Sequence, residues 1–126
     1  MLNDGFEIFL FNRTHAKAVA LAEEIGLSPE RVRKVADPAD VSLIVNTTSA
    51  SLQNDEIPID WTRAEPHALA YDLMYSAEPT PFMASASHHG LRTLDGRRLL
   101  VAQGARSFEW WVGIEAPRDV MLEAIQ

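Results

Sequence analysis

The sequence predicts an α/β domain in which helices flank a mostly parallel sheet. Short segments dense in apolar residues, typical of strands covered on both faces, alternate along the chain with segments of helical periodicity. The 126 residues are 47% hydrophobic and 23% charged, a composition typical of a globular chain with one core. We therefore expect a single domain over residues 1–126.

The first strand is expected over residues 6–11, where aromatic and β-branched residues predominate. A helix should follow, with Thr14 as its N-cap, apolar residues three and four positions apart, and Gly26 as its stop. Residues 41–45 form the second apolar strand pattern, and the polar run at 46–49 ends it.

The same alternation continues through the middle of the chain. Residues 68–75 are the third strand candidate. Thr80 and Pro81 provide an N-cap and a proline at the first helical position, and Gly90 is placed to end that helix. A short last strand is expected at 91–94.

The C-terminal part is expected to be helical. Residues 97–112 have helical periodicity, and Pro117 permits a last helix through residue 125. The stripe predicted on the longer helix consists of Leu100, Gly104, Phe108, Trp111 and Val112. The adjacent Trp110 and Trp111 are expected to pack in the core and at its edge.

The overall charge argues against some classes of partner. Eleven basic and eighteen acidic residues give a net charge of −7, which would repel nucleic acid and anionic membranes. The sequence has no cysteine, no apolar run near the ~20 residues that span a bilayer, and no signal-peptide pattern at its start. We therefore expect a cytoplasmic protein. The adjacent His88 and His89 would point about 100° apart on a helix, so we expect surface positions and no metal.

The polar residues after the first strand suggest a ligand. Dinucleotide-binding folds that prefer NAD place an acidic residue at the end of the second strand, where it binds the ribose 2′-hydroxyl. This chain instead has Asn12 and Arg13, followed by Thr14 at a helix start and by Lys17. Two cations beside the N–H groups of a helix N-terminus suit a 2′-phosphate, so the pattern favours NADP. The alternative is that Arg13 and Lys17 are solvated, although cations at this end oppose the helix dipole.

Other polar residues follow the later strands, where ligands bind to an open parallel sheet. The run at 46–49 could bind a cofactor or cap the next helix. Asp72 must be hydrogen-bonded or paired if it is buried, either as an anchor for loops or in catalysis. Tyr75 and Gln103 could bind the hydroxyls of a polar substrate or take part in ordinary packing.

Taken in order, these strand ends resemble the C-terminal NADP-binding half of the shikimate dehydrogenases. The segments that carry the resemblance are 12–17, 46–49, 71–75, 80–82, 95–96, 99–105 and 107–113, which together cover nearly the whole chain. The resemblance implies a partial Rossmann-like fold that lacks the first strand and helix of that fold. It also implies NADPH-dependent reduction of 3-dehydroshikimate to shikimate, a step of aromatic amino-acid biosynthesis. A quinate/shikimate dehydrogenase is the alternative within the family.

The resemblance also implies roles for individual residues. The residues that would bind NADP are Asn12, Arg13, Thr14, Lys17, Thr48, Ser49, Leu73 and Gly96. The first four of these would hold the adenosine 2′-phosphate, and the last two would lie near the nicotinamide. Tyr75 and Gln103 would contact shikimate. The catalytic lysine and aspartate of the family lie in an N-terminal substrate domain, so no residue of this chain is assigned a catalytic role.

Two features of the family have no counterpart in this sequence: the N-terminal domain and the glycine-rich pyrophosphate turn. In the strand order 3-2-1-4-5-6 the first strand is central, so a chain without it would have two unpaired strand edges. We expect such a chain to be inactive alone and to need a separate N-terminal half, or further copies of itself. An alternative from another class is a truncated, non-catalytic relative that binds a nucleotide or a partner chain.

Overall fold

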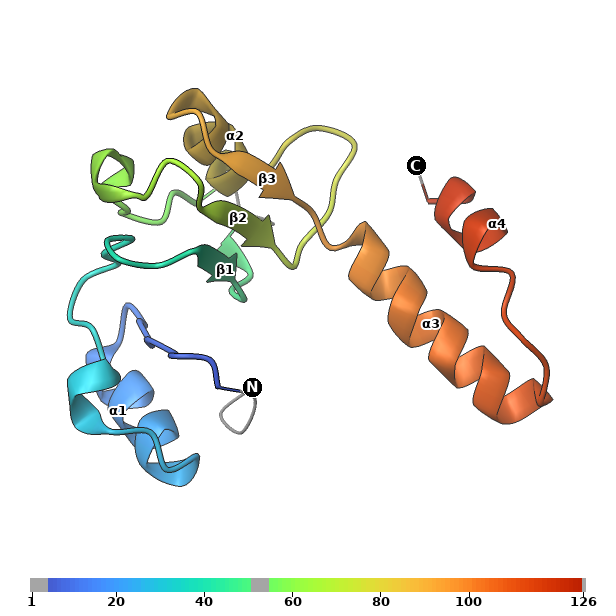
Figure 1. The fold of residues 1–126 in the computed structure, drawn as a ribbon, viewed down its shortest axis with the longest axis horizontal. Coiled ribbons are helices and arrows are strands. Elements are labelled where there is room, and N and C mark those ends of the chain that lie inside the picture. The colour runs from blue at the N-terminus through green and yellow to red at the C-terminus, as the bar shows by residue number, and fades with distance from the viewer. Residues whose placement is uncertain (1–4, 51–54, 126) are drawn as a thin grey trace.

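A computed structural model describes residues 5–50 and 55–125 and contains one parallel sheet of three strands (Figure 1). The strands are β1 (Leu43–Asn46), β2 (Leu69–Asp72) and β3 (Arg92–Leu94), in the order β1-β2-β3. Helices alternate with the strands, so the predicted α/β class and the parallel sheet are confirmed.

The register of the sheet places the carboxyl ends of β1 and β2 next to each other. Leu43 pairs with Leu69 at one end of this ladder, and Asn46 pairs with Asp72 at the other. Parallel strands end at a common edge, so the polar residues that follow them gather there. The candidate site is built on this edge.

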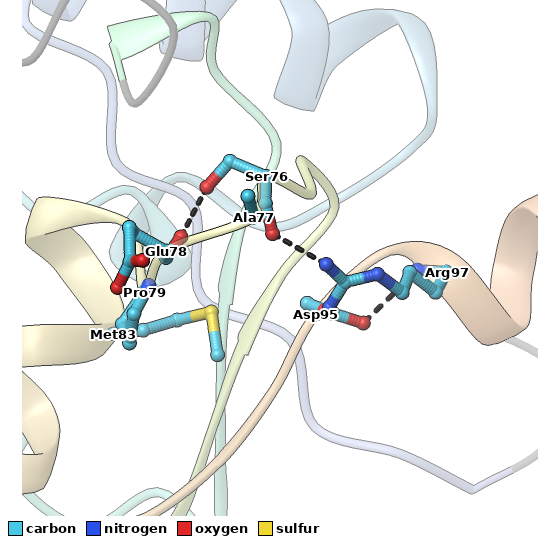
Figure 2. Close-up of a pocket in the computed structure, with 7 residues that line it drawn as sticks. All are labelled: Ser76, Ala77, Glu78, Pro79, Met83, Asp95 and Arg97. Carbon is cyan, nitrogen blue, oxygen red and sulfur yellow. Dashed lines mark hydrogen bonds and ion pairs between the residues drawn. The ribbon is translucent and has the colours of Figure 1, made fainter. Parts of the chain in front are cut away.

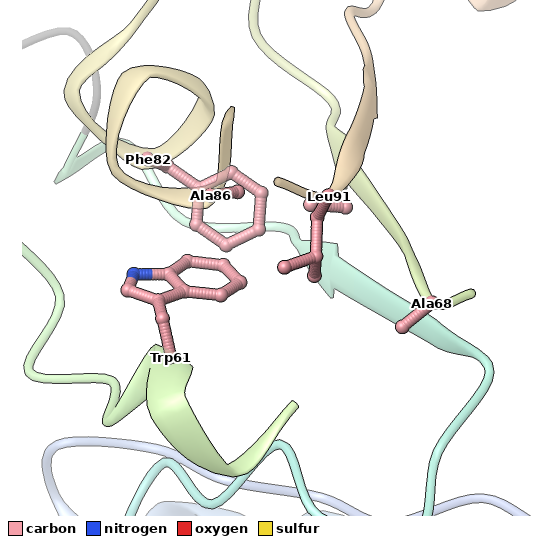
Figure 3. Close-up of a cluster of buried hydrophobic side chains, with 6 residues drawn as sticks. Trp61, Ala68, Phe82, Ala86 and Leu91 are labelled. Atoms are coloured by element: carbon pink, nitrogen blue, oxygen red, sulfur yellow. The ribbon is translucent and has the colours of Figure 1, made fainter. Parts of the chain in front are cut away.

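The core lies between the sheet, helix α2 (Pro81–His88) and the 3₁₀ turn η3 (Trp61–Arg63). Trp61 packs against Phe82 in an edge-to-face arrangement, with ring centroids 5.2 Å apart (Figure 3). The buried members of this cluster are Trp61, Ala68, Ala70, Phe82, Ala86 and Leu91. Three of the six are alanines, so the two aromatic rings and Leu91 contribute most of its apolar surface.

The ends of α2 follow from local sequence. The Thr80 hydroxyl accepts a hydrogen bond from the Met83 N–H at 3.3 Å, and Pro81 is the first helical residue. Beyond the helix, Gly90 has a φ of 82°, a left-handed conformation that glycine adopts without steric cost. The predicted start and stop of this helix are confirmed.

The N-terminal part departs from the prediction in one respect. Residues 6–11 form no strand. In the described part of the chain, they pair with another segment only through one isolated parallel β-bridge, between Leu10 and Val32. The expected helix forms as α1 (His15–Glu24), in which Ala18 and Ala22 are buried, and the turn η1 (Pro29–Arg31) follows it. An apolar sequence favours a strand, but the ladder requires a neighbouring strand to pair with.

The two C-terminal helices project away from the sheet. Helix α3 (Arg97–Val112) has the predicted bounds, and α4 (Arg118–Glu123) folds back along it (Figure 1). The predicted stripe is wrong in part. The buried residues of α3 are Val101 and Ala105. Of the predicted members, Leu100, Gly104 and Phe108 are half-buried, and Trp111 and Val112 are exposed.

The predicted packing of the tryptophan pair is also wrong. Trp110 is 85% exposed and Trp111 is 78% exposed. Helical periodicity shows which residues share a face, but it does not show which face a neighbouring element covers. In this structure α4 packs along α3 and brings the Met121 side chain next to Gly104, while both tryptophans remain exposed.

Ion pairs join segments that are apart in sequence, and two of them bear on the packing of the turns and helices. Arg63 donates through Nε and Nη2 to the carboxylate of Asp37, at 2.9 Å each, and this pairing lowers the pKa of Asp37. The Ala116 N–H and the Arg118 guanidinium both donate hydrogen bonds to Glu109 and lower the pKa of that carboxyl group. These contacts link α3 to the start of α4. A carboxyl group whose pKa is lower in the folded state than in the unfolded state stabilises the fold at pH values above its unfolded-state pKa. That stabilisation is lost as the pH falls through the folded-state value. Both pairs therefore support the fold at neutral pH and weaken in acid.

Candidate functional site

The edge formed by the carboxyl ends of β1 and β2 is organised around a buried carboxylate. Asp72 is fully buried, and its Oδ1 accepts hydrogen bonds from Asn46 Nδ2 and from the Met74 N–H, at 3.1 Å each. Its Oδ2 accepts a hydrogen bond from the Thr80 hydroxyl at 2.6 Å. A buried carboxylate is stable only when such donors replace its lost water. The structure therefore makes Asp72 an anchor for loops, which is one of its two predicted roles.

The loop after β1 is held by the other end of the Asn46 amide. Asn46 Oδ1 accepts hydrogen bonds from the N–H and the hydroxyl of Thr48, at 3.0 and 2.8 Å. The Thr48 hydroxyl in turn accepts from the Ala50 N–H at 3.2 Å. Thr48 and Ser49 are both exposed at the edge of the sheet. The loop is thus held at Thr48, whose N–H and hydroxyl are both bonded within it.

Leu73 and Gly96, which are far apart in sequence, meet through their backbones. A Cβ atom added at Gly96 would lie 2.0 Å from the carbonyl oxygen of Leu73, so no other residue fits without movement of the backbone. The Gly96 N–H also donates to the carbonyl of Met74 at 3.0 Å. Glycine is needed here for close approach and not for an unusual φ, since its φ is −75°.

The predicted phosphate-binding residues lie together at the start of α1. Arg13 precedes the helix, Lys17 lies in its first turn, and both side chains are exposed. The Thr14 N–H donates to Asn12 Oδ1 at 2.9 Å, but no side chain in the described residues caps the helix and its first turn has no acidic residue. An uncapped N-terminus flanked by two cations fits a phosphate group.

The two predicted substrate residues are not joined in this structure. Tyr75 is 43% exposed in the loop after β2, and Gln103 is exposed on α3. Among the described hydrogen bonds, none connects these two side chains.

A small cavity lies beside this edge, between the loop after β2 and the start of α3 (Figure 2). It is lined by Ser76, Ala77, Glu78, Pro79, Met83, Asp95 and Arg97. Arg97 pairs with Asp95, donates to the carbonyl of Ser76, and donates from Nε to the Ile125 carbonyl at 3.0 Å. The cavity measures about 110 Å³, below the roughly 300–1,000 Å³ of typical small-molecule pockets. It is too small to hold a dinucleotide.

Sequence reasoning did not identify Asn46, Thr80 or Arg97 as partners that organise this region. Asn46 belongs to the predicted polar run and Thr80 is predicted as a helix cap, and each has an additional partner that the sequence does not show. Among the residues that the structure describes, no group of histidine and acidic side chains could hold a metal ion. In the same part of the chain, no helix is both long and apolar enough to span a membrane.

The comparisons of this chain with known proteins agree on one group of relatives. Residues 96–126 match the family model for the shikimate 5′-dehydrogenase C-terminal domain. The shikimate dehydrogenase (NADP(+)) of Herminiimonas arsenicoxydans is 42% identical over 109 residues, which cover 85% of this chain and 40% of that protein. The enzyme of the same name from Methanothrix thermoacetophila is 34% identical, covering 98% of this chain and 46% of that protein.

A solved structure agrees in fold over nearly the whole chain. Shikimate 5-dehydrogenase from Thermus thermophilus, in complex with NADP(H) and shikimate, superposes with a TM-score of 0.82 at 33% identity. The superposition covers 98% of this chain and 46% of that one, so this chain spans less than half the length of the relatives that it matches. In sequence and in its Rossmann-like fold, the chain is therefore a relative of the shikimate dehydrogenases that matches their C-terminal part.

Proposed function

We propose that this chain is the C-terminal portion of an NADP-binding domain and that it acts as part of a shikimate dehydrogenase. In that enzyme NADPH would supply the hydride that reduces 3-dehydroshikimate to shikimate, and this chain would bind and orient the cofactor. The relatives that support the proposal are named as NADP(+) enzymes, and the Thermus relative was solved with NADP(H) and shikimate.

The proposed roles divide between two regions of the chain. The start of α1, from Asn12 to Lys17, would bind the adenosine 2′-phosphate. The residues at the sheet edge, Thr48, Ser49, Leu73 and Gly96, would contact the rest of the dinucleotide. Tyr75 and Gln103 would contact the substrate, and further parts of the complete enzyme would bring them together. The observation that carries the proposal is the uncapped, cationic start of α1.

The test of this proposal is selective loss of NADP binding in Arg13→Ala. We expect the affinity for NADP to fall by roughly tenfold or more, because a charge-assisted contact to phosphate would be lost. The affinity for NAD, which has no 2′-phosphate, should change little. Titration of both cofactors by calorimetry measures this, with Arg106→Ala on α3 as the matched control.

An unchanged dissociation constant for NADP in Arg13→Ala would refute the proposed phosphate site. Turnover of shikimate with NADP, for the chain alone and mixed with an N-terminal half, separates an enzyme from a non-catalytic module. Binding of NADP without turnover in either sample would favour the truncated, non-catalytic relative. Comparison of shikimate with quinate in the same assay would identify the preferred substrate.

The N-terminal half of a shikimate dehydrogenase is the partner that we propose for this chain. In the described residues β1 pairs with β2 on one side and has no strand on its other side. Leu43 and Val45 of β1 are each 40% exposed, so this edge combines unpaired backbone groups with apolar side chains. An edge of this kind pairs readily with another strand. The relatives contain more than half of their length outside the matched region, which would supply that strand.

Sedimentation at micromolar concentration tests the partner. We expect the chain to self-associate when alone and to form a one-to-one complex with the separately expressed N-terminal part of the Herminiimonas relative. Leu43→Lys should weaken that complex, because a lysine on a strand edge opposes pairing. Val35→Lys, at a 65% exposed position outside the sheet, is the control. A compact monomer that does not bind the added N-terminal half would contradict this proposal.

A further inference from the structure

The carboxylate of Asp72 connects three separate elements of the fold. Its donors come from the last residue of β1, from the loop after β2 and from the residue that caps α2: Asn46, Met74 and Thr80. Asn46 and Asp72 are 26 residues apart in sequence. Asn46, Asp72 and Thr80 are each at least 95% buried. Such a junction restricts how the three elements can move relative to one another.

Two of these connections lead directly to residues that we propose to contact the cofactor. Through the amide of Asn46, Asp72 is linked to the N–H and the hydroxyl of Thr48. The second connection runs through Met74, whose N–H donates to Asp72 and whose carbonyl accepts from the Gly96 N–H. Gly96 in turn lies against the carbonyl of Leu73. One carboxylate is therefore connected by hydrogen bonds to both loops at the sheet edge.

We infer that Asp72 is a positioning residue for dinucleotide binding: it holds the loops at 46–49 and 73–76 in the arrangement that receives the part of the cofactor remote from the 2′-phosphate. This inference rests on the proposed function. Asp72 does not itself touch the ligand, because it is fully buried and its carboxylate is bonded to protein groups. The start of α1, where the adenosine 2′-phosphate would bind, has no contact with this network among the described hydrogen bonds.

The separation of the two regions gives a test that distinguishes positioning from general stability. NADP⁺ would use both regions, whereas adenosine 2′,5′-bisphosphate keeps the 2′-phosphate that would bind at the start of α1 and lacks the nicotinamide end of the dinucleotide. Asp72→Asn keeps the shape of the side chain but removes its charge and replaces one acceptor oxygen by a donor, so that Asn46, Met74 and Thr80 can no longer all donate to it. We expect this variant to bind NADP⁺ roughly 5- to 50-fold more weakly, because a buried hydrogen bond to a charged group would be lost. Its affinity for the bisphosphate should stay within about twofold of the parent.

The matched control is Asp60→Asn. Asp60 accepts hydrogen bonds from the N–H and hydroxyl of Thr62 at 3.2 and 2.6 Å, so the chemical change is the same, but Asp60 is exposed at the start of η3. This control should bind both ligands like the parent. If Asp72→Asn fails to fold by circular dichroism, Thr80→Val is used in its place. That substitution removes one donor to Asp72 and also the hydroxyl that caps α2, and Thr80→Ser should restore NADP⁺ binding because its hydroxyl can make both hydrogen bonds.

The outcomes separate this inference from the proposed function. A parent chain that binds neither ligand, alone or with its N-terminal half, contradicts the proposed function and with it the inference. A parent that binds both, with a variant that loses both equally, shows that Asp72 acts on stability alone and overturns the inference. Unchanged NADP⁺ binding in Asp72→Asn and in Thr80→Val also overturns it. Selective loss of NADP⁺ binding, rescued by Thr80→Ser, supports it.

Discussion

Replacing Phe82 by alanine is expected to reduce the free energy of unfolding by about 3–5 kcal/mol. The Phe82 ring is 5% exposed and packs edge-to-face on Trp61 between α2 and the sheet (Figure 3). Because half of the buried cluster is alanine, its neighbours have short side chains that cannot fill the space that the ring leaves. Domains of this size are stable by only about 5–15 kcal/mol, so the variant should be largely unfolded at moderate urea concentrations.

Urea denaturation followed by far-ultraviolet circular dichroism measures the effect of Phe82→Ala. Phe6→Ala removes the same side chain at a position that is 61% exposed, and its free energy of unfolding should change by less than about 0.5 kcal/mol. If the chain is studied as a complex with its N-terminal half, both variants are compared in that complex. A change of under about 1 kcal/mol for Phe82→Ala would mean that the α2–sheet contact is not the main core.

The second large effect is expected for Gly96→Ala. The added Cβ would lie 2.0 Å from the Leu73 carbonyl oxygen, a backbone atom that cannot rotate away. Relief of this contact requires the turn before α3 or the loop after β2 to shift, and the hydrogen bond from the Gly96 N–H to the Met74 carbonyl would be strained. We expect a loss of roughly 2–4 kcal/mol in stability. Weaker NADP binding should accompany it, because both loops belong to the proposed cofactor site.

Gly104→Ala is the matched control for Gly96→Ala. A Cβ at Gly104 would meet only the terminal methyl of Met121, at 3.3 Å, and that flexible side chain can move. Gly104 lies within α3, where alanine is favoured over glycine by about 0.5–1 kcal/mol. This variant should therefore be as stable as the parent or slightly more stable. Equal effects of the two substitutions in thermal unfolding would contradict the close approach of Gly96 to Leu73.

Several elements could be predicted from the sequence because their signals are local. The bounds of α2 follow from Thr80, Pro81 and Gly90, and α3 has the predicted limits. The three strands of the sheet lie within one residue of the segments predicted for them, and each strand is shorter than its segment. The fourth run, at 6–11, has equally favourable residues but formed one bridge, since a ladder depends on a partner and not on propensity.

The site was predictable only in its components. The polar residues after each strand predicted the edge at which we propose that the cofactor binds, because parallel strands share the edge at which they end. The cationic start of α1 was likewise visible as a run of residue types. The connections among these residues were not visible, since they join positions as distant as Asn46 and Asp72.

The helices, the order of the elements and the polar residues that follow each strand could be inferred from the sequence, because capping, periodicity and residue type act within a few positions along the chain. The fold was needed to show that Asp72 is an anchor for loops, that Gly96 must be glycine, and that Trp110 and Trp111 are exposed. These outcomes depend on which distant segment occupies the space beside a residue. That neighbour is set by the packing of the whole chain and not by the residues next to it in sequence.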